Sequence, residues 1–178
     1  PTDVQKNNGV IDYVAEDEKD ATNIAKKILS YFQGEIKDWK ADDQTQLSNI
    51  MPKDRRWSYP VRDIIKIISD IEQFTEIRPE YGKGIVSCFI RIEGKPFGLL
   101  ANDSQHLGGA IDSEGADKAS SFIEMCSEYG LPIISLVDTP GFMVGPDSEK
   151  EGAVRRMSNL FKIGSKVKVP LTAIFLRK

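Results

Sequence analysis

The stretch LPIISLVDTPGFMVG, residues 131–145, decides how this chain folds. It contains a short apolar run rich in β-branched residues at 133–137, which is typical of a strand buried on both faces of a sheet. The run stops at DTPG, residues 138–141, where proline removes a backbone donor and glycine permits a positive φ. The chain therefore turns sharply at the carboxyl end of the strand. Because ligands of α/β proteins bind in the crevice beyond the carboxyl ends of strands, we expect chemistry at this loop.

The segments upstream predict a hairpin, a loop and a helix. Two apolar segments at 85–93 and 96–101 are separated only by a Gly-Lys pair, and so short a loop predicts an antiparallel hairpin. A loop with paired glycines follows at 102–112. Apolar residues at helical spacing then predict a helix at 114–129, with Ser113 as its N-cap.

The segments downstream predict a second helix and a last strand. Ser148 and Glu151 have the spacing of a capping box, which predicts one helix from here to about Ile163. An apolar strand is expected at 171–176. This alternation predicts an α/β fold with a mixed sheet and right-handed crossovers between its parallel strands. A closing parallel strand needs cover on both faces, so we expect the chain to be an incomplete piece of a longer protein.

The first part of the chain divides into a helix and a polar connector. An acidic cluster at 16–18 opens an amphipathic helix that Gly34 ends. The connector, residues 34–60, is polar and charged, and we expect Trp39 and Trp57 to dock on the core and a domain boundary to fall here. The pattern further predicts a turn of helix at 43–50, an isoleucine-rich helix at 61–71 and a short strand at 74–77.

Composition excludes several classes of protein. The 178 residues carry a net charge of −3, which argues against nucleic acid as the main partner. No segment approaches the roughly 18 apolar residues of a membrane-spanning helix, and the polar N-terminus resembles no secretory or transit peptide. Cys88 and Cys126 lie in apolar patterns, which indicates reduced core thiols of a cytoplasmic or mitochondrial matrix protein. With one histidine, His106, we predict neither a histidine-based metal site nor a catalytic triad.

Three kinds of chemistry fit the loops. VDTPG resembles the strand-end motif of GTP-binding switches, but neither Gly-Lys pair is followed by the Ser or Thr that a phosphate-binding loop requires. Asp103, Asp112 or Asp138 could act as an acid or base, although nothing in the sequence pairs them. Main-chain amides at the 108–109 glycine pair and at Gly141 could converge on an oxyanion, a mechanism that needs no reactive side chain.

Read together, these motifs resemble one family. The segments IRIEGKPFGLLAND and DKASSFIEMCSEYGLPIISLVDTPGFMVG, at 90–103 and 117–145, are similar to the carboxyltransferase β subunits of biotin-dependent acetyl-, propionyl- and methylcrotonyl-CoA carboxylases. The segment at 61–77 resembles the start of that family's C-terminal domain, and the segment at 7–32 resembles the close of its N-terminal domain. One departure is Phe32-Gln33, where the family has Leu-Pro.

The resemblance implies a crotonase-like fold of repeated ββα units with flanking helices. It divides the chain into the tail of the acyl-CoA domain (1–33), a linker (34–60) and the first part of the carboxybiotin domain (61–178). It implies transfer of a carboxyl group from N1-carboxybiotin to the α-carbon of an acyl-CoA. The implied partners are a biotin carboxyl carrier protein, a biotin carboxylase component and further copies of the subunit, with no nucleic acid or membrane.

The resemblance assigns the biotin-side pocket to two loops and gives no side chain a catalytic role. Its residues are Asn102, Leu107, Gly108 and Gly109 in the first loop, and Asp138, Thr139, Pro140, Gly141, Phe142 and Gly145 in the second. Each is alternatively a turn residue, and Phe142 is alternatively a core residue. The family's principal oxyanion loops, for biotin and for acyl-CoA, fall outside these 178 residues, so we expect this piece alone to be inactive.

Two other functions remain open. A biotin-dependent decarboxylase would use the same half-reaction in reverse. A non-catalytic interaction domain on the same fold would lack the two oxyanion loops in its full-length chain.

Overall fold

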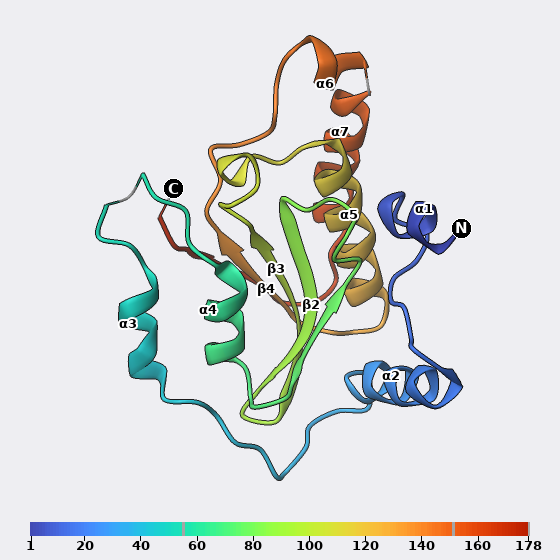
Figure 1. Cartoon of the computed structure of the whole chain (residues 1–178), viewed down its shortest axis with the longest axis vertical. Coiled ribbons are helices and arrows are strands. Elements are labelled where there is room, and N and C mark those ends of the chain that lie inside the picture. The colour runs from blue at the N-terminus through green and yellow to red at the C-terminus, as the bar shows by residue number, and fades with distance from the viewer. Residues whose placement is uncertain (55, 151, 178) are drawn as a thin grey trace.

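The computed structural model describes residues 1–54, 56–150 and 152–177 (Figure 1). Its centre is one mixed sheet with the strand order β1-β2-β3-β4-β5. The first three strands are antiparallel, whereas β3 pairs with β4 and β4 with β5 in parallel. The strands are β1 (Phe74–Ile77), β2 (Ile85–Ile92), β3 (Lys95–Asn102), β4 (Ile133–Val137) and β5 (Leu171–Phe175). The predicted strands, hairpin and mixed sheet are confirmed.

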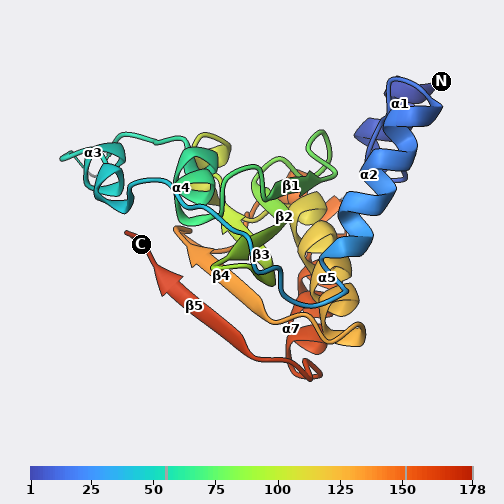
Figure 2. The same ribbon diagram turned by 90° about the horizontal axis from the view of Figure 1, so that it is seen from below.

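Helices lie on both faces of this sheet (Figure 2). One face carries α2 (Glu18–Ser30), α5 (Ser113–Glu128) and α7 (Ala153–Gly164), and the other carries α3 (Leu47–Ile50) and α4 (Val61–Ile68). The remaining short helices are α1 (Thr2–Asn7), η1 (Gln44–Gln46), η2 (Leu107–Gly109) and α6 (Pro146–Lys150). The sequence pattern missed α1.

The alternation of side chains along β2 divides the core into two clusters. Ile85 and Phe89 face α5 and the end of α2, while Val86, Cys88 and Ile90 face α4. Successive strand residues point to opposite faces, so a strand with helices on both sides must be apolar throughout. This explains why the sequence of β2 reads as a nearly continuous apolar run.

The edge strand β5 is different, because all five of its residues are exposed. In Figure 2 it forms the lower left margin of the molecule. Phe175, at its end, has 73% of its surface exposed. No other described segment therefore buries the apolar side chains of β5.

Two local predictions are wrong, and a third lies partly outside the described residues. The N-cap of α5 is Asp112, which accepts from the Gly115 amide at 2.7 Å, because a carboxylate at the N-cap satisfies a free helical amide better than the next residue can. The expected single helix at 148–163 is broken into α6 and α7 at Gly152, whose backbone is left-handed (φ 72°). Glu151 of the expected capping box lies outside the described residues, and the Ser148 hydroxyl instead donates to the Met143 carbonyl.

The two connector tryptophans do not dock on the core, since Trp39 is 42% exposed and Trp57 is 69% exposed. Main-chain hydrogen bonds hold the connector instead. The Ile36 amide donates to the Gly94 carbonyl at 3.0 Å, and the Ile71 amide donates to the Lys40 carbonyl at 2.7 Å. The connector thus needs no aromatic anchor.

Arg91 joins the first helix and the connector to the hairpin. Its side chain is 1% exposed and donates to the carbonyls of Ser30 (2.7 Å), Gly34 (2.8 Å) and Gly94 (2.8 Å). It also lies over the Tyr31 ring, with 5.3 Å from the guanidinium carbon to the ring centroid. The end of α2 is therefore bound to the sheet through one buried cation.

Replacing Arg91 by Met should destabilise the protein by about 3 kcal/mol, because three carbonyls lose a charged donor in a buried place. Urea unfolding monitored by circular dichroism measures this free energy. Arg56→Met is the matched control: Arg56 is exposed and pairs with the exposed Asp54, so its loss should change stability by less than about 0.5 kcal/mol. Equal midpoints for the two variants would contradict a joining role for Arg91.

Candidate functional site

The candidate site consists of the two loops that follow β3 and β4. These strands are parallel neighbours, with Gly98 opposite Ile133 and Ala101 opposite Leu136, so their carboxyl ends meet at one edge of the sheet. The loops then pair with each other. The Ile111 amide donates to the Gly141 carbonyl at 3.0 Å, and the Met143 amide donates to the Ile111 carbonyl at 2.8 Å. The structure therefore brings together the two segments that the sequence singled out.

Close backbone approach makes glycine necessary at one position. Gly109 has φ 88°, and a Cβ built there would lie 2.3 Å from the Asp138 carbonyl oxygen. Its neighbour Gly108 has φ 61°, but a Cβ built on Gly108 would have no atom within 4 Å. Gly141 and Gly145 also have positive φ, 120° and 134°, and open space in place of a side chain. The loops thus touch each other at Gly109, whereas open space stands in place of a side chain at Gly108, Gly141 and Gly145.

Two of the amides considered for an oxyanion are already bonded inside the loops. The Gly109 amide donates to the His106 carbonyl at 2.9 Å, and the Gly141 amide donates to the Thr139 hydroxyl at 3.0 Å. In this conformation they do not converge on a shared acceptor. Their bonds fix the shape of the loops instead.

A buried ion pair lies beneath the second loop. Asp138 is 0% exposed, and its carboxylate accepts from Arg177, which follows β5, at 3.0 Å. The Asp138 amide donates to the Asn102 side-chain oxygen at 3.2 Å, which connects the ends of β3 and β4. The Arg177 guanidinium also lies over the Tyr59 ring at 5.0 Å. Burial raises the pKa of the Tyr59 phenol, and the Asp138 carboxylate acts in the same direction.

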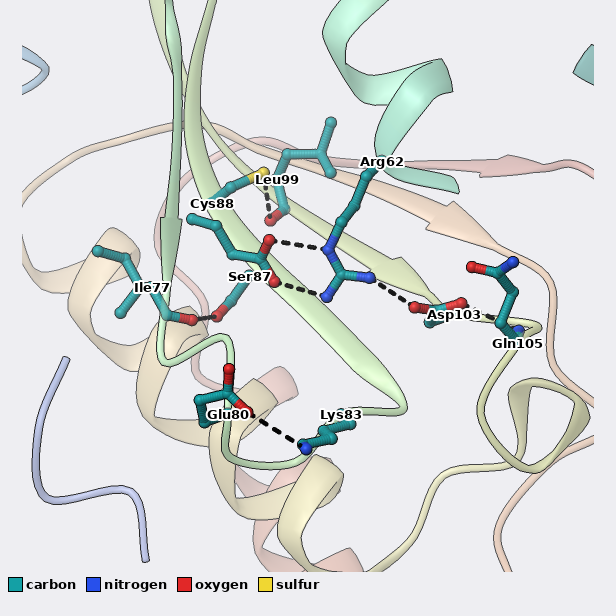
Figure 3. Close-up of polar contacts among 10 residues, drawn as sticks. Arg62, Ile77, Glu80, Lys83, Ser87, Cys88, Leu99, Asp103 and Gln105 are labelled. Atoms are coloured by element: carbon teal, nitrogen blue, oxygen red, sulfur yellow. Dashed lines mark hydrogen bonds and ion pairs between the residues drawn. The ribbon is translucent and has the colours of Figure 1, made fainter. Parts of the chain in front are cut away.

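A second ion-pair network supports the first loop (Figure 3). Arg62 of α4 binds both carboxylate oxygens of Glu76, at 2.7 and 2.9 Å, and binds Asp103 at 2.6 Å. The second Asp103 oxygen accepts from the Gln105 amide at 2.9 Å. Hydrogen bonding to these carboxylates raises the pKa of the Arg62 guanidinium above its ordinary value. The start of the loop is therefore held by a permanent charge.

The three aspartates considered for acid–base chemistry each make a structural contact. Asp103 binds Arg62, Asp112 caps α5 and lies 3.3 Å from the His106 ring, and Asp138 binds Arg177. Among the described residues, their hydrogen-bond and ion-pair partners include no other carboxylate. Asp112 is therefore a helix-start residue.

The remaining predicted residues line the outer side of the loops. Leu107 and Pro140 are exposed, and Phe142 packs edge-to-face on Phe161 of α7 with ring centroids 5.4 Å apart. The three described cavities are lined by other residues and lie elsewhere. Sequence reasoning missed Arg177 and Arg62. The signal for Arg177 was its place at the end of a strand parallel to the one that ends at Asp138.

Among the described residues there is no group of three or more His, Cys, Asp or Glu side chains that could hold a metal ion. No helix in the described ranges is long and apolar enough to cross a membrane.

The carboxyl transferase domain family matches residues 2–178. The chain belongs to this family. Among curated members, the methylmalonyl-CoA carboxyltransferase 12S subunit of Propionibacterium freudenreichii subsp. shermanii is 33% identical over 96% of this chain and 34% of its own length. The β6 subunit of a biotin-dependent acetyl-/propionyl-coenzyme A carboxylase of Mycobacterium tuberculosis is 34% identical over 100% of this chain and 38% of its own length. The chain thus spans little more than a third of these carboxyl transferases.

Solved carboxyl transferase structures share the fold. A single-chain, multi-domain long-chain acyl-CoA carboxylase matches 98% of this chain with 49% identity and a TM-score of 0.96, over 18% of its own chain. The transcarboxylase 12S structure matches 98% of this chain with 31% identity and a TM-score of 0.88, over 36% of its own chain. The crotonase-like fold predicted from the resemblance is confirmed.

Replacing Gly109 by Ala should cost about 3 kcal/mol of stability, because the new Cβ adds an overlap with the Asp138 carbonyl to the strain of a left-handed backbone. Gly108→Ala is the control, with a similar φ and open space, and should cost only about 1 kcal/mol. Thermal unfolding of both variants measures the difference. If both lose the same stability, the contact between the loops is not tight.

Replacing Asp138 by Asn should cost about 3–5 kcal/mol, because Arg177 keeps its charge in a buried place without a carboxylate. A double-mutant cycle with Arg177→Met tests the pair by urea unfolding. The double variant should be more stable than the sum of the single losses predicts, by about 1.5 kcal/mol or more. Additive losses would show that the two side chains act independently.

Proposed function

We propose that this chain forms the carboxybiotin-binding part of a carboxyltransferase that moves a carboxyl group from N1-carboxybiotin to the α-carbon of an acyl-CoA. The observation that carries this proposal is the family match over residues 2–178. The relatives named for acetyl-, propionyl- and methylmalonyl-CoA support an acyl-CoA as the acceptor. The loops after β3 and β4 lie where α/β proteins bind ligands.

The loops fit the ring of biotin. Gly108, Gly141 and Gly145 leave open space where a side chain would stand, so the planar ureido ring of biotin can approach the backbone there. The exposed Leu107 and Pro140 supply apolar surface beside it. When bound, N1-carboxybiotin supplies the carboxyl group.

Other residues of the two loops position this surface. Asn102 and Asp138 join the ends of β3 and β4, Thr139 closes the DTPG turn through Gly141, and Gly109 lets the loops touch. Phe142 anchors the second loop on α7. Because the Gly109 and Gly141 amides are bonded within the loops, we place the oxyanion donors in other segments, as the family resemblance implies.

We propose a biotin carboxyl carrier protein and a biotin carboxylase as partners, and an oligomer of the subunit. The structure of transcarboxylase 12S, which is described as a hexamer in a multienzyme core, supports this proposal. We assign the division at 1–33, 34–60 and 61–178 to the acyl-CoA domain, a linker and the carboxybiotin domain. The free, buried Cys88 and Cys126 support the cytoplasm or the mitochondrial matrix as its compartment.

Labelled carboxybiotin and a panel of acyl-CoA thioesters test the reaction with the full-length protein. We expect the label to appear in the carboxylated acyl-CoA. In a second assay with a labelled malonyl-type thioester and biotin, label that moves to carboxybiotin, without carboxylation of any acyl-CoA in the first assay, would identify a decarboxylase. Neither reaction would identify a non-catalytic interaction domain.

Replacing Gly108 by Leu tests the loop surface itself. The side chain would occupy the open space, so the KM for biotin should rise by about 10-fold, which corresponds to about 1.4 kcal/mol of binding. The KM for the acyl-CoA should stay within about twofold, since it binds elsewhere. Gly164→Leu, in open space at the end of α7, is the control and should change neither constant. An unchanged KM for biotin in Gly108→Leu would place the biotin site outside these loops.

A further inference from the structure

A cleft away from the two candidate loops lies between the N-terminal segment, α2 and β1, and we call it the N-terminal cleft. Both views show α1 and α2 at the same margin of the molecule (Figures 1 and 2). The cleft has a volume of about 380 Å³, which is within the range of small-molecule sites. Its lining is mainly apolar and comes from Ile11, Tyr13, Val14, Ile24, Phe74 and Pro79.

Two contacts of Arg78 fix the wall of the N-terminal cleft. The Arg78 amide donates to the Asp12 carbonyl at 2.9 Å, and its guanidinium donates to the Asp12 carboxylate at 2.6 Å. The guanidinium also donates to the Ser121 hydroxyl of α5 at 3.0 Å. The backbone of Arg78 is left-handed (φ 52°), which is unfavourable for a residue with a side chain, and these bonds hold it there. The N-terminal segment is therefore fastened to β1 and α5 without a ligand.

The charged side chains of the cleft leave two amines for a ligand. Its three carboxylates are each paired with a cation: Asp12 with Arg78, Glu76 with Arg62, and Glu80 with Lys83. Lys6 of α1 and Lys27 of α2 also line the cleft, and neither amine has a hydrogen bond or ion pair among the described residues. Lys27 is exposed and Lys6 is half-buried, so a dissolved ligand can reach both. Within the described ranges, the cleft thus offers positive charge and no free carboxylate.

We propose that the N-terminal cleft binds an aromatic monocarboxylate, with its carboxylate at Lys6 and Lys27 and its ring on the apolar lining. The two amines favour an anion, and the apolar lining favours a ligand whose remaining surface is apolar. A rigid ring loses less conformational freedom on binding than an alkyl chain does, and Tyr13 and Phe74 offer rings on which it can pack. An apolar cavity of about 150 Å³ holds benzene, so this larger cleft has room for a fused two-ring acid such as 2-naphthoate.

Titration calorimetry of the full-length protein with sodium 2-naphthoate tests this proposal without any turnover. We expect one site per chain with a Kd in the millimolar range or below. The double variant Lys6→Met/Lys27→Met should bind about 10-fold more weakly or worse, because the carboxylate loses both partners. Neither lysine has a partner among the described residues, so the variant should fold. Lys19→Met/Lys26→Met is the matched control: it removes two exposed lysines of α2 that do not line the cleft, and it should bind as the wild type does.

Measurements on the wild type test the chemistry of the ligand. The uncharged 2-naphthamide should bind about 10-fold more weakly than 2-naphthoate. Inorganic phosphate at equal concentration should not displace 2-naphthoate, because it has no apolar part. Raising the salt concentration from about 50 to about 500 mM should weaken binding, since the two amines are open to solvent.

Four results would each overturn the proposal: no binding of 2-naphthoate, equal binding of 2-naphthamide, displacement by phosphate, or full affinity in Lys6→Met/Lys27→Met. Saturating biotin and acyl-CoA should leave 2-naphthoate binding unchanged, because no residue of the two candidate loops lines the cleft. Displacement by either would place the bound acid in the proposed reaction site and would also overturn the proposal. The proposal does not rest on carboxyl transfer, so that function keeps its own test.

Discussion

The parallel pairing of β3 with β4 is the constraint on which the candidate site depends. Two strands that run in the same direction end at the same edge, so the loops that leave them must share space. Here they come so close that the backbone of one occupies the place of a side chain in the other, at Gly109. Glycine at position 109 is thus a consequence of this close approach, whereas Gly108, Gly141 and Gly145 leave open space that a ligand can use.

Charged hydrogen bonds of arginines that are buried or partly buried secure the elements that meet around this edge. Arg177 with Asp138 fastens the end of β5 to that of β4, Arg62 fastens α4 to β1 and β3, and Arg91 fastens the end of α2 to the hairpin. Each arginine has several acceptors, which is the arrangement that makes a buried cation tolerable. Lys118 is the exception among the buried cations of the described ranges, since its Nζ has no hydrogen-bond partner there.

The sequence was sufficient to predict the strands and the hairpin of the sheet, because apolar runs and a two-residue turn determine these elements locally. It located the two loops, since glycine and proline mark strand ends. It could not assign the cap of α5, where Asp112 and Ser113 are both good caps and only the geometry chooses. It did not predict the break between α6 and α7 at Gly152, because the apolar residues on either side of this glycine keep helical spacing. The ion pairs at the two loops join residues 41 positions apart (Arg62 and Asp103) and 39 positions apart (Arg177 and Asp138), and only the fold identifies such partners. The role of the loops in binding biotin remains a prediction.

The exposed edge strand β5 has a consequence for handling the protein. Leu171, Ile174 and Phe175 are uncovered, and one side of the strand offers unpaired main-chain groups to any other extended segment. Such an edge templates intermolecular sheet formation. A recombinant product limited to these 178 residues would therefore tend to associate through this strand and precipitate at high concentration.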